Sequence, residues 1–382
     1  MEIRGDESCA WEFRVDDTSC ISTEQRTLFR NFKGFLSINM NIRLACPEDS
    51  QSIDRYIEQS ASSSLYHKYA WGEVIEDSFG HKSYYLICID DNGSLSGILP
   101  MVHLKSLMFG NFMVSMPYFN YGGVCADNEV NRNHLIGEAI KIAKELDARH
   151  IEFRQEESFN NGFPFKTEKV SMRARVPRSP DELWKSFPSK LRSQIKVPQK
   201  AGVSARIGKL EELDNFYEVF SINMSHLGTP VYPKRFFRNI LETFPSCTWI
   251  CSVFSNGIPV ASGFLVGFKN VIEIPWASSL RKWNRLSPNM LLYWTALQFA
   301  CEKGFTVFDF GRSTPGEGTF KFKEQWGATP SPMRWHYWLR SGGAIPEITP
   351  RNPKYRIAIE LWKKLPVPLT RFLGPHIIKN IP

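Results

Sequence analysis

Apolar residues along the chain fall into segments with helical spacing and into short continuous runs, and the two kinds of segment follow one another in mixed order. Residues 48–60, 65–79 and 131–147 have the apolar spacing of helices. Residues 82–102 form two apolar runs around Asp91-Asn92-Gly93, which predicts a β-hairpin. Short strands are expected near 40–44, 112–117 and 150–154. This order of elements predicts an α/β fold.

The second half of the chain repeats this order. Helices are predicted over 180–200, 211–224 and 288–302, a hairpin over 247–267 around Ser255-Asn256-Gly257, and a strand over 305–310. In both halves an apolar helix is followed by a turn and by a strand with one acid, Glu152 in the first strand and Asp309 in the second. We infer two copies of one α/β fold, each a mixed central sheet flanked by helices.

The chain is predicted to divide into four parts. The pattern is interrupted by prolines after Val176, which places the boundary between the copies near residues 172–182. The predicted parts are listed here in chain order: a poorly ordered extension at 1–39, a first domain at 40–175, a second and catalytic domain at 176–345, and a basic helical tail at 346–382. Met40 is a plausible true start of the chain.

The sequence predicts neither a membrane-spanning helix nor export from the cell. The longest apolar segment, residues 290–301, is shorter than the ~18–20 residues that a spanning helix needs. The N-terminus is acidic and lacks the layout of a signal peptide, so a cytoplasmic location is expected. The segment from Tyr355 to Pro366 is predicted to form a basic amphipathic helix, which either rests on the inner membrane surface or docks against the protein.

Charge and cysteine content narrow the chemistry only in part. The chain has 47 basic and 39 acidic residues, which favours an anionic partner. Residues 169–206 hold ten of these bases against two acids, and this region either attracts an anionic substrate or is simply a solvated face. The eight cysteines are scattered without a CxxC motif and the histidines stand singly, so reduced thiols and no metal site are expected.

The densest candidate chemistry lies between Arg281 and Gly327. Ser287 followed by Pro288 predicts a helix start, whose free N–H groups could hold a phosphate together with Arg281 and Arg285. An ordinary capped helix with solvated bases explains the same residues.

Asp309 and Lys323 are the candidates for catalysis in this segment. Asp309 lies within an apolar strand and needs a partner, which Arg312 could supply, either to orient a substrate or to pin the strand end. Lys323 could donate to the oxyanion that develops during acyl transfer, although residue type alone favours a surface lysine.

Three motifs in this order resemble the Fem family of aminoacyltransferases, within the GNAT-like superfamily. They are Phe308-Asp-Phe-Gly-Arg-Ser313, the glycine turn that follows it, and Phe322-Lys-x-x-Trp-Gly327, after a helix that opens with Ser287-Pro-Asn289. The segment from His226 to Phe237, which contains Tyr232, resembles the subgroup associated with exosortase and exopolysaccharide clusters.

The resemblance implies tandem GNAT-like (acyl-CoA N-acyltransferase) domains that transfer an aminoacyl or acyl group onto an amine of a peptidoglycan or exopolysaccharide precursor. In relatives the Phe-Lys pair that matches Phe322 and Lys323 lies at the reaction centre. We expect Lys323, Asp309 and Arg312 to be the catalytic residues. The expected substrate-binding residues are Arg281, Arg285, Ser287, Asn289, Phe322, Trp326 and Tyr232. In peptidoglycan-building relatives the donor is aminoacyl-tRNA, whose acceptor end would be a partner of this chain, and no bound cofactor is expected.

Two other functions stay open at this point. One is a CoA-dependent N-acyltransferase that acts on an amino sugar, and the other is a non-catalytic binding module in envelope polysaccharide assembly. The stretch Arg285-Leu-Ser-Pro-Asn-Met290 lacks the glycines of the usual acetyl-CoA loop, which argues against ordinary CoA binding. The second half also lacks a long charged helical insertion, which argues against contact with the body of a tRNA.

Overall fold

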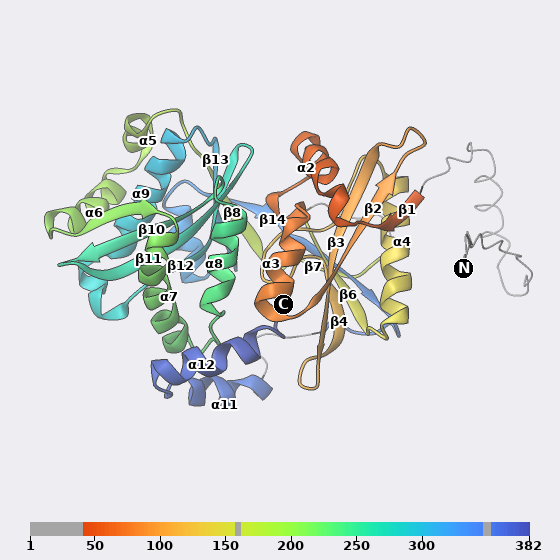
Figure 1. Cartoon of the computed structure of the whole chain (residues 1–382). Coiled ribbons are helices and arrows are strands. Elements are labelled where there is room, and N and C mark those ends of the chain that lie inside the picture. The colour runs from red at the N-terminus through yellow and green to blue at the C-terminus, as the bar shows by residue number, and fades with distance from the viewer. Residues whose placement is uncertain (1–40, 157–161, 347–352) are drawn as a thin grey trace, which may run out of the picture. The chain divides into compact units, whose positions relative to one another are not determined.

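The apolar runs fold into two mixed β-sheets with helices on both faces of each (Figure 1). The computed structural model describes residues 41–156, 162–346 and 353–382. The extension predicted at 1–39 and the start at Met40 lie outside the described residues.

The strands of the first sheet are β1 Asn41–Leu44, β2 Lys82–Ile89, β3 Leu95–Ser106, β4 Gly110–Val114, β5 Cys125–Ala126, β6 His150–Gln155, β7 Phe165–Lys166 and β15 Arg334–Leu339. The strands of the second sheet are β8 Val170–Arg175, β9 Ser204–Gly208, β10 Thr248–Ser255, β11 Ile258–Phe268, β12 Val271–Ser279, β13 Val307–Ser313 and β14 Thr329–Pro332.

The α-helices are α2 Ser50–Gln59, α3 Ala70–Phe79, α4 Glu129–Glu145, α5 Pro180–Ser186, α6 Ser189–Lys200, α7 Leu213–Leu227, α8 Lys234–Thr243, α9 Pro288–Glu302, α10 Gly318–Glu324, α11 Pro353–Trp362 and α12 Val367–Ile378. Short 3-10 helices are η2 Pro47–Asp49, η3 Leu65–His67, η4 Leu210–Glu212 and η5 Arg281–Leu286.

The two sheets have the same internal topology, which confirms the predicted duplication. In the first sheet the antiparallel meander β1–β4 is followed by α4 and then by β6, which pairs in parallel with β4. In the second sheet the meander β9–β12 is followed by α9 and then by β13, which pairs in parallel with β12. The last residue pair of each parallel ladder contains the acid of the repeat, Val114 with Glu152 and Glu273 with Asp309.

The halves exchange their last strands. β8 follows the first half in the chain but pairs with β13 of the second sheet. β15 follows the second half but returns to pair with β6 of the first sheet. The division at residues 175 and 176 stays a prediction, and a cut there would separate each sheet from one of its strands.

One hydrophobic core spans both halves. It contains α2 and α3 and one face of the first sheet, together with α7, α8 and the facing side of the second sheet. α4 covers the outer face of the first sheet. α9 covers the outer face of the second sheet with α5 and α6. Because α9 is buried between that sheet and other helices, its sequence is apolar on nearly all sides.

Local sequence signals account for most of the predicted elements. Helix α9 spans the predicted range, and Asn256 and Gly257 form a two-residue hairpin turn with φ values of 51° and 77°. The single helix predicted over 180–200 is wrong. Phe187 and Pro188 divide it into α5 and α6, because proline cannot donate the helix hydrogen bond.

The C-terminal tail forms two helices, α11 and α12, where one was predicted. α11 ends at Trp362, and Pro366 stands at the start of α12. Within the described ranges, no helix is both long and apolar enough to cross a membrane.

The strand exchange predicts that a change which destabilises one sheet speeds up amide hydrogen exchange mainly in the strands paired in that sheet. Ile151 of β6 is buried, and the change Ile151→Val removes one methylene group from it. This change should lower the free energy of unfolding by about 0.5–1.5 kcal/mol. Hydrogen exchange measured by mass spectrometry should then speed up in β15, which pairs with β6, more than in β14.

The matched control is Ile272→Val in β12, at an equally buried position of the second sheet. This change should speed up exchange in β13 and β8 and leave β15 unchanged. Equal acceleration of β14 and β15 by Ile151→Val would contradict the exchanged topology.

Candidate active site where the second sheet divides

The parallel strands β12 and β13 diverge after three residue pairs, and this opening in the sheet is called the second fork. β12 pairs with β13 from Val271 to Glu273 and then continues to Ser279 along β11. β13 continues to Ser313 along β8, with an irregular register between Asp309 and Arg312. Gly311 takes a φ of 74°, a conformation that glycine adopts without strain. Both strand ends therefore leave backbone groups that the β12–β13 ladder does not use.

Asp309 is fully buried at the base of the second fork and is saturated with donors. Its Oδ2 accepts from the Tyr121 hydroxyl at 2.6 Å and from Arg173 Nε at 2.9 Å. Its Oδ1 accepts from the Ser171 hydroxyl and from the Gly311 amide, both at 2.7 Å. These donors satisfy a carboxylate that would otherwise be costly to bury.

The expected pairing of Asp309 with Arg312 is therefore wrong. Arg173, from the exchanged strand β8, forms the ion pair instead. Arg312 lies three residues along an irregular strand, and its guanidinium lies 4.8 Å from the ring centre of Trp335. Asp309 and Arg312 belong to the same segment, but their side chains have different partners.

Lys323 is buried beside this segment. Its Nζ donates to the carbonyl oxygens of Gly311 and Arg312, each at 3.0 Å, which ties α10 to the end of β13. Burial lowers the pKa of Lys323 to about 8, against an opposing effect of the Asp309 charge. An ammonium has three N–H donors, so one remains beyond these two bonds. Lys323 thus contacts the backbone of the segment that carries Asp309 and Arg312, and a shared catalytic role of the three side chains stays a prediction.

Arg312 is a cation without a carboxylate partner among the described residues. More than a third of its side chain is exposed, yet burial by surrounding protein, followed by the charge of Arg154, lowers its pKa. Trp335 lies between Arg312 and Arg154, whose guanidinium is 4.3 Å from the ring centre.

Arg154 already has a partner, whereas Arg312 remains available. Arg154 Nε donates to Glu152 at 2.8 Å, and the Tyr337 hydroxyl donates to the other oxygen of Glu152 at 2.8 Å. Tyr232 belongs to this group, because the charges of Arg154 and Arg312 both act on its hydroxyl while burial raises its pKa to about 12. An anionic group bound here would therefore pair with Arg312, because Arg154 is already paired with Glu152.

Glu273 is a buried acid that the sequence analysis did not single out. Tyr66 donates to its Oε2 at 2.7 Å and Asn120 to its Oε1 at 3.3 Å. Burial raises its pKa well above the usual range of a glutamate, and the neighbouring Asp309 charge adds to the effect. The signal that could have revealed it is the same as for Asp309, an acid inside an apolar strand.

The start of α9 forms a separate group of candidate residues. Arg281 and Arg285 are exposed on η5, and Ser287 and Asn289 are half-buried. Ser287 precedes the helix as predicted, but its hydroxyl makes no capping hydrogen bond and its φ is 51°. Within the described residues, no hydrogen bond, ion pair or ring contact joins these four side chains to Asp309, Arg312 or Lys323.

Phe322 of α10 and Trp326, in the turn that follows α10, lie around the ring of Tyr293, with ring centres 5.1 Å and 6.1 Å away. Trp326 is only 2% exposed and also packs against Phe187, so it supports α10 from the core. Phe322 is partly exposed. Phe322 is therefore better placed than Trp326 to contact a substrate. A substrate contact of either residue stays a prediction.

The corresponding opening in the first sheet is filled by the chain itself. After Val114 the segment 115–124 crosses between the strands, and the Gly123 amide donates to the Arg154 carbonyl at 3.1 Å. Arg154 also donates to the carbonyl of Phe119, and Gln155 donates to that of Val124 at 2.8 Å. This segment leaves little room for a ligand, so the second fork is the better candidate site.

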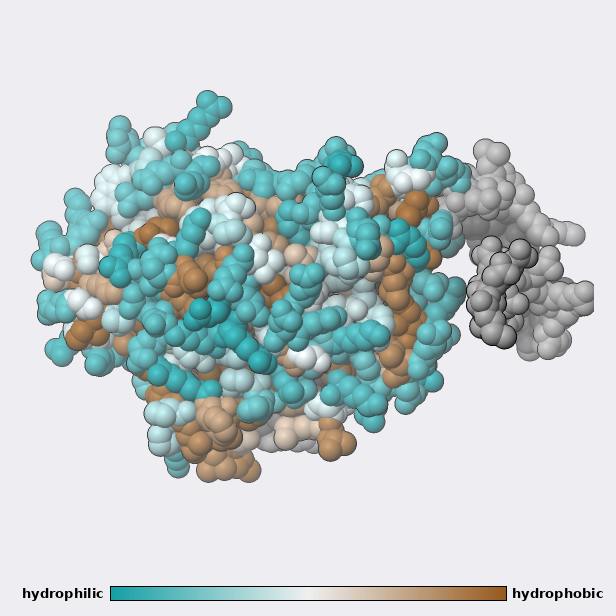
Figure 2. Space-filling view, in the orientation of Figure 1, coloured by the Kyte–Doolittle hydropathy of each residue, from teal (hydrophilic) through white to brown (hydrophobic). Residues whose placement is uncertain are grey.

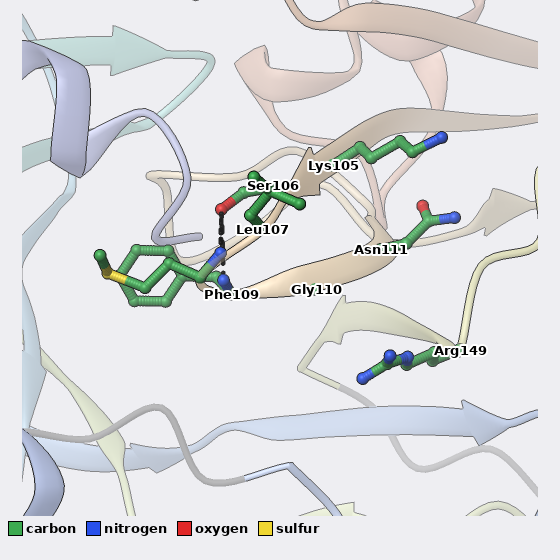
Figure 3. A pocket seen from close by; sticks show the side chains of 8 residues that line it. Lys105, Ser106, Leu107, Phe109, Gly110, Asn111 and Arg149 are labelled. Atoms are coloured by element: carbon green, nitrogen blue, oxygen red, sulfur yellow. Dashed lines mark hydrogen bonds between the residues drawn. The ribbon is translucent and has the colours of Figure 1, made fainter.

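Candidate metal sites are absent from the parts of the chain that the structure describes. No group of three or more His, Cys, Asp or Glu residues there is arranged to hold a metal ion. A hollow of about 490 Å³ lies far along the chain from the second fork, at the β3–β4 turn, lined by residues that include Lys105, Leu107 and Arg149 (Figure 3).

Comparisons with known proteins identify the domain that carries this site. The model of the acetyltransferase (GNAT) domain family matches residues 185–324, which contain both strands of the second fork, α9 and Lys323. No protein with a curated description matches the sequence.

Solved structures extend the likeness to both halves. FemX superposes with a TM-score of 0.63 at 15% identity, covering 84% of this chain and 100% of its own. L-PGS from Bacillus licheniformis gives 0.51 at 12% identity, covering 87% and 98%. A tandem GNAT protein from the clavulanic acid biosynthesis pathway gives 0.50 at 11% identity, covering 80% and 100%. At these identities the likeness shows the fold, which is the predicted tandem GNAT-like α/β architecture.

The buried position of Glu273 predicts how stability depends on pH. The unfolded chain releases the proton of Glu273 in the usual glutamate range, whereas the folded protein retains it to higher pH. The free energy of unfolding should therefore fall as pH rises above that range, by about 1–3 kcal/mol from this group between about pH 5 and pH 8. Glu273→Gln should remove this component in urea unfolding measured across the range.

Glu302→Gln, a change of an exposed glutamate at the end of α9, is the matched control and should leave the pH dependence of wild type intact. Parallel pH curves for wild type and Glu273→Gln would show that the pKa of Glu273 is not raised by folding.

Proposed function

We propose that the chain is a Fem-type acyltransferase that moves an aminoacyl or acyl group onto an amine of an anionic cell-envelope precursor. The amine nitrogen attacks the carbonyl carbon of an activated ester or thioester. A C–N bond forms, the C–O or C–S bond breaks, and the leaving oxygen or sulfur receives the proton that the amine loses. Such a reaction needs placement of the two substrates and stabilisation of the oxyanion more than a classical catalytic triad.

The position of Lys323 carries the proposal. Its ammonium is buried within a GNAT domain and held by two carbonyl oxygens at the end of β13, so its direction is fixed before a substrate binds. In a site shielded from water, a donor with a fixed direction stabilises a developing oxyanion strongly. Asp309 acts through positioning, because it fixes Gly311 and is itself saturated with donors.

Arg312 supports an anionic acceptor. Its guanidinium has no carboxylate partner in the described structure, stacks on Trp335 and lies near Tyr232. A guanidinium of this kind suits bidentate binding of a phosphate or carboxylate, both of which envelope precursors carry. The likeness to FemX, which carries the name of the Fem family, supports a peptidoglycan precursor, whereas the motif around Tyr232 supports an exopolysaccharide precursor.

The start of α9 supports a donor that carries phosphates. Arg281 and Arg285 are exposed and form no ion pair with any residue that the structure describes, and the N-terminus of a long helix attracts anions. Both an acyl-CoA and the acceptor end of an aminoacyl-tRNA meet this requirement. The reaction is proposed to take place in the cytoplasm, where both donors occur.

A specific observation favours the CoA-dependent alternative. GNAT domains typically use acyl-CoA as co-substrate, and the family model covers this helix start. The absence of glycine from the loop is less of an obstacle than the sequence indicated, because Ser287 itself takes the left-handed backbone conformation.

Replacing Lys323 tests the site. Lys323→Met keeps the length of the side chain and removes the donor, and turnover of either donor should fall about 10²–10³-fold in kcat. Lys321→Met is the matched control on the exposed side of the same helix and should leave kcat unchanged. In wild type, kcat should decline as pH rises through about 8, because the ammonium of Lys323 loses its proton.

Full turnover by folded Lys323→Met would remove Lys323 from the mechanism. A rise of kcat through the same pH range would contradict its role as a charged donor, since a general base becomes active on losing its proton.

Binding and turnover of acetyl-CoA and of aminoacyl-tRNA, measured for wild type and for the double variant Arg281→Ala/Arg285→Ala, identify the acyl donor. If the donor is aminoacyl-tRNA, calorimetry with acetyl-CoA shows no heat of binding, while aminoacyl-tRNA supports transfer to an amine acceptor. Removing the two arginines should then raise the KM for the donor about tenfold or more and leave kcat nearly unchanged. Acetyl-CoA binding that the arginine changes weaken would instead establish the CoA-dependent alternative. Binding of neither donor would contradict both.

A further inference from the structure

An apolar and basic face lies along the lower side of the described structure in Figure 1. α11 and α12 lie along this lower side, and the turn between β3 and β4 reaches it from the first sheet (Figure 1). Figure 2 shows apolar surface at both places along the same edge. Because the two patches lie along the same edge, one flat partner can meet both at once.

The exposed apolar side chains are concentrated on these segments. Leu107 and Met108, at the β3–β4 turn, are 110% and 73% exposed. Of the thirteen large apolar side chains that are exposed in the described structure, four more lie between residues 357 and 372, namely Ile357, Leu361, Leu369 and Phe372. Ile357 and Leu361, and likewise Leu369 and Phe372, have the spacing of residues on one face of a helix. Surface of this kind is usually functional.

The helices α11 and α12 are held by their other side. Arg371 Nε donates to the Ser221 hydroxyl at 2.8 Å, and the hydroxyl of Tyr118 and Nε2 of His81 both donate to the Lys379 carbonyl at 2.6 Å. Gly374 is packed so closely on Val231 that a Cβ would lie 2.7 Å from the Val231 nitrogen. The exposed face is thus the one that docking leaves free.

The β3–β4 turn is equally well fixed. The hydroxyl of Ser106 accepts from the amides of Met108 and Phe109 at 3.1 Å and 3.2 Å (Figure 3). The turn therefore presents Leu107 and Met108 as a preformed tip.

The charges around both patches are mostly positive. Residues 356–382 contain five Lys or Arg and one acid, Glu360, which is paired with Lys363 at 2.7 Å. Arg356 and Lys364 are exposed near the helical patch, and Lys105 and Arg149 line the hollow at the turn. Asp147, close to the turn, is paired with Arg340 at 2.8 Å. Projecting apolar side chains ringed by bases complement an anionic bilayer, whose acyl boundary takes the apolar groups while its headgroups meet the charges.

We propose that this face binds the surface of an anionic lipid bilayer, with the β3–β4 tip and the α11–α12 helices as its two contact points. The contact is peripheral, since it depends on side chains at the interface. It does not depend on the proposed reaction, because none of its residues belongs to the second fork or to the start of α9.

Flotation with lipid vesicles tests the proposal on the full chain. Vesicles of phosphatidylcholine with about 30% phosphatidylglycerol should bind the protein at least about tenfold better than pure phosphatidylcholine, and salt should weaken the binding. Leu107→Ser/Met108→Ser and Leu361→Ser/Phe372→Ser should each reduce binding about tenfold. Lys364→Glu/Arg149→Glu should abolish the preference for anionic vesicles.

The matched control is Val197→Ser/Ile258→Ser, which changes two exposed apolar residues on the second half and should bind as wild type does. Lys323→Met should also bind normally, which separates this proposal from the proposed reaction. Equal binding by wild type and both apolar variants would overturn it. So would failure of wild type to bind anionic vesicles, or a dimer in ultracentrifugation that these apolar variants dissociate, which would make the face a contact between two copies.

Discussion

Two buried acidic side chains, the Asp309 carboxylate and the Glu273 carboxyl group that retains its proton to higher pH, are the constraint on which the rest of this structure depends. Asp309 and Glu273 face each other across the last pair of the β12–β13 ladder, and neither is exposed enough for water to solvate it. A buried carboxylate is tolerated only when donors surround it. Here Tyr66, Asn120 and Tyr121 of the first half supply several of those donors. The halves must therefore dock for the site to keep its shape, and the shared core and the exchanged strands hold them together.

Duplication supplied two openings of the same kind, and the chain uses them differently. In the first sheet the segment 115–124 occupies the opening, and Arg154 and Glu152 hold it there. In the second sheet β12 runs on without such a crossing, and Lys323 bonds to the end of β13. The first half thus supplies hydrogen-bond donors to the second fork, and the second half retains the opening where the proposed reaction would take place. The division of labour follows from what fills each opening, since the topology is common to both.

The features that could be predicted from the sequence are those that depend on residues close together in the chain. The α9 helix, both hairpins, the repeat itself and the burial of Asp309 follow from local patterns and spacing. The partner of Asp309 did not, because Arg173 reaches it through the exchanged strand β8, more than a hundred residues away. Trp335 returns to the first sheet in the same way and brings Arg154 and Arg312 together. Residue type also misleads for Lys323, since most lysines are solvated and only tertiary packing buries this one.

A structure of the protein bound to a bisubstrate analogue, in which the acyl donor and the acceptor amine are joined, tests the central claim most directly. The account predicts the oxygen of the transferred carbonyl within about 3 Å of Lys323 Nζ, with an anionic group of the acceptor on Arg312. An analogue bound in the first sheet, or bound to the second half with its carbonyl remote from Lys323, would contradict the account.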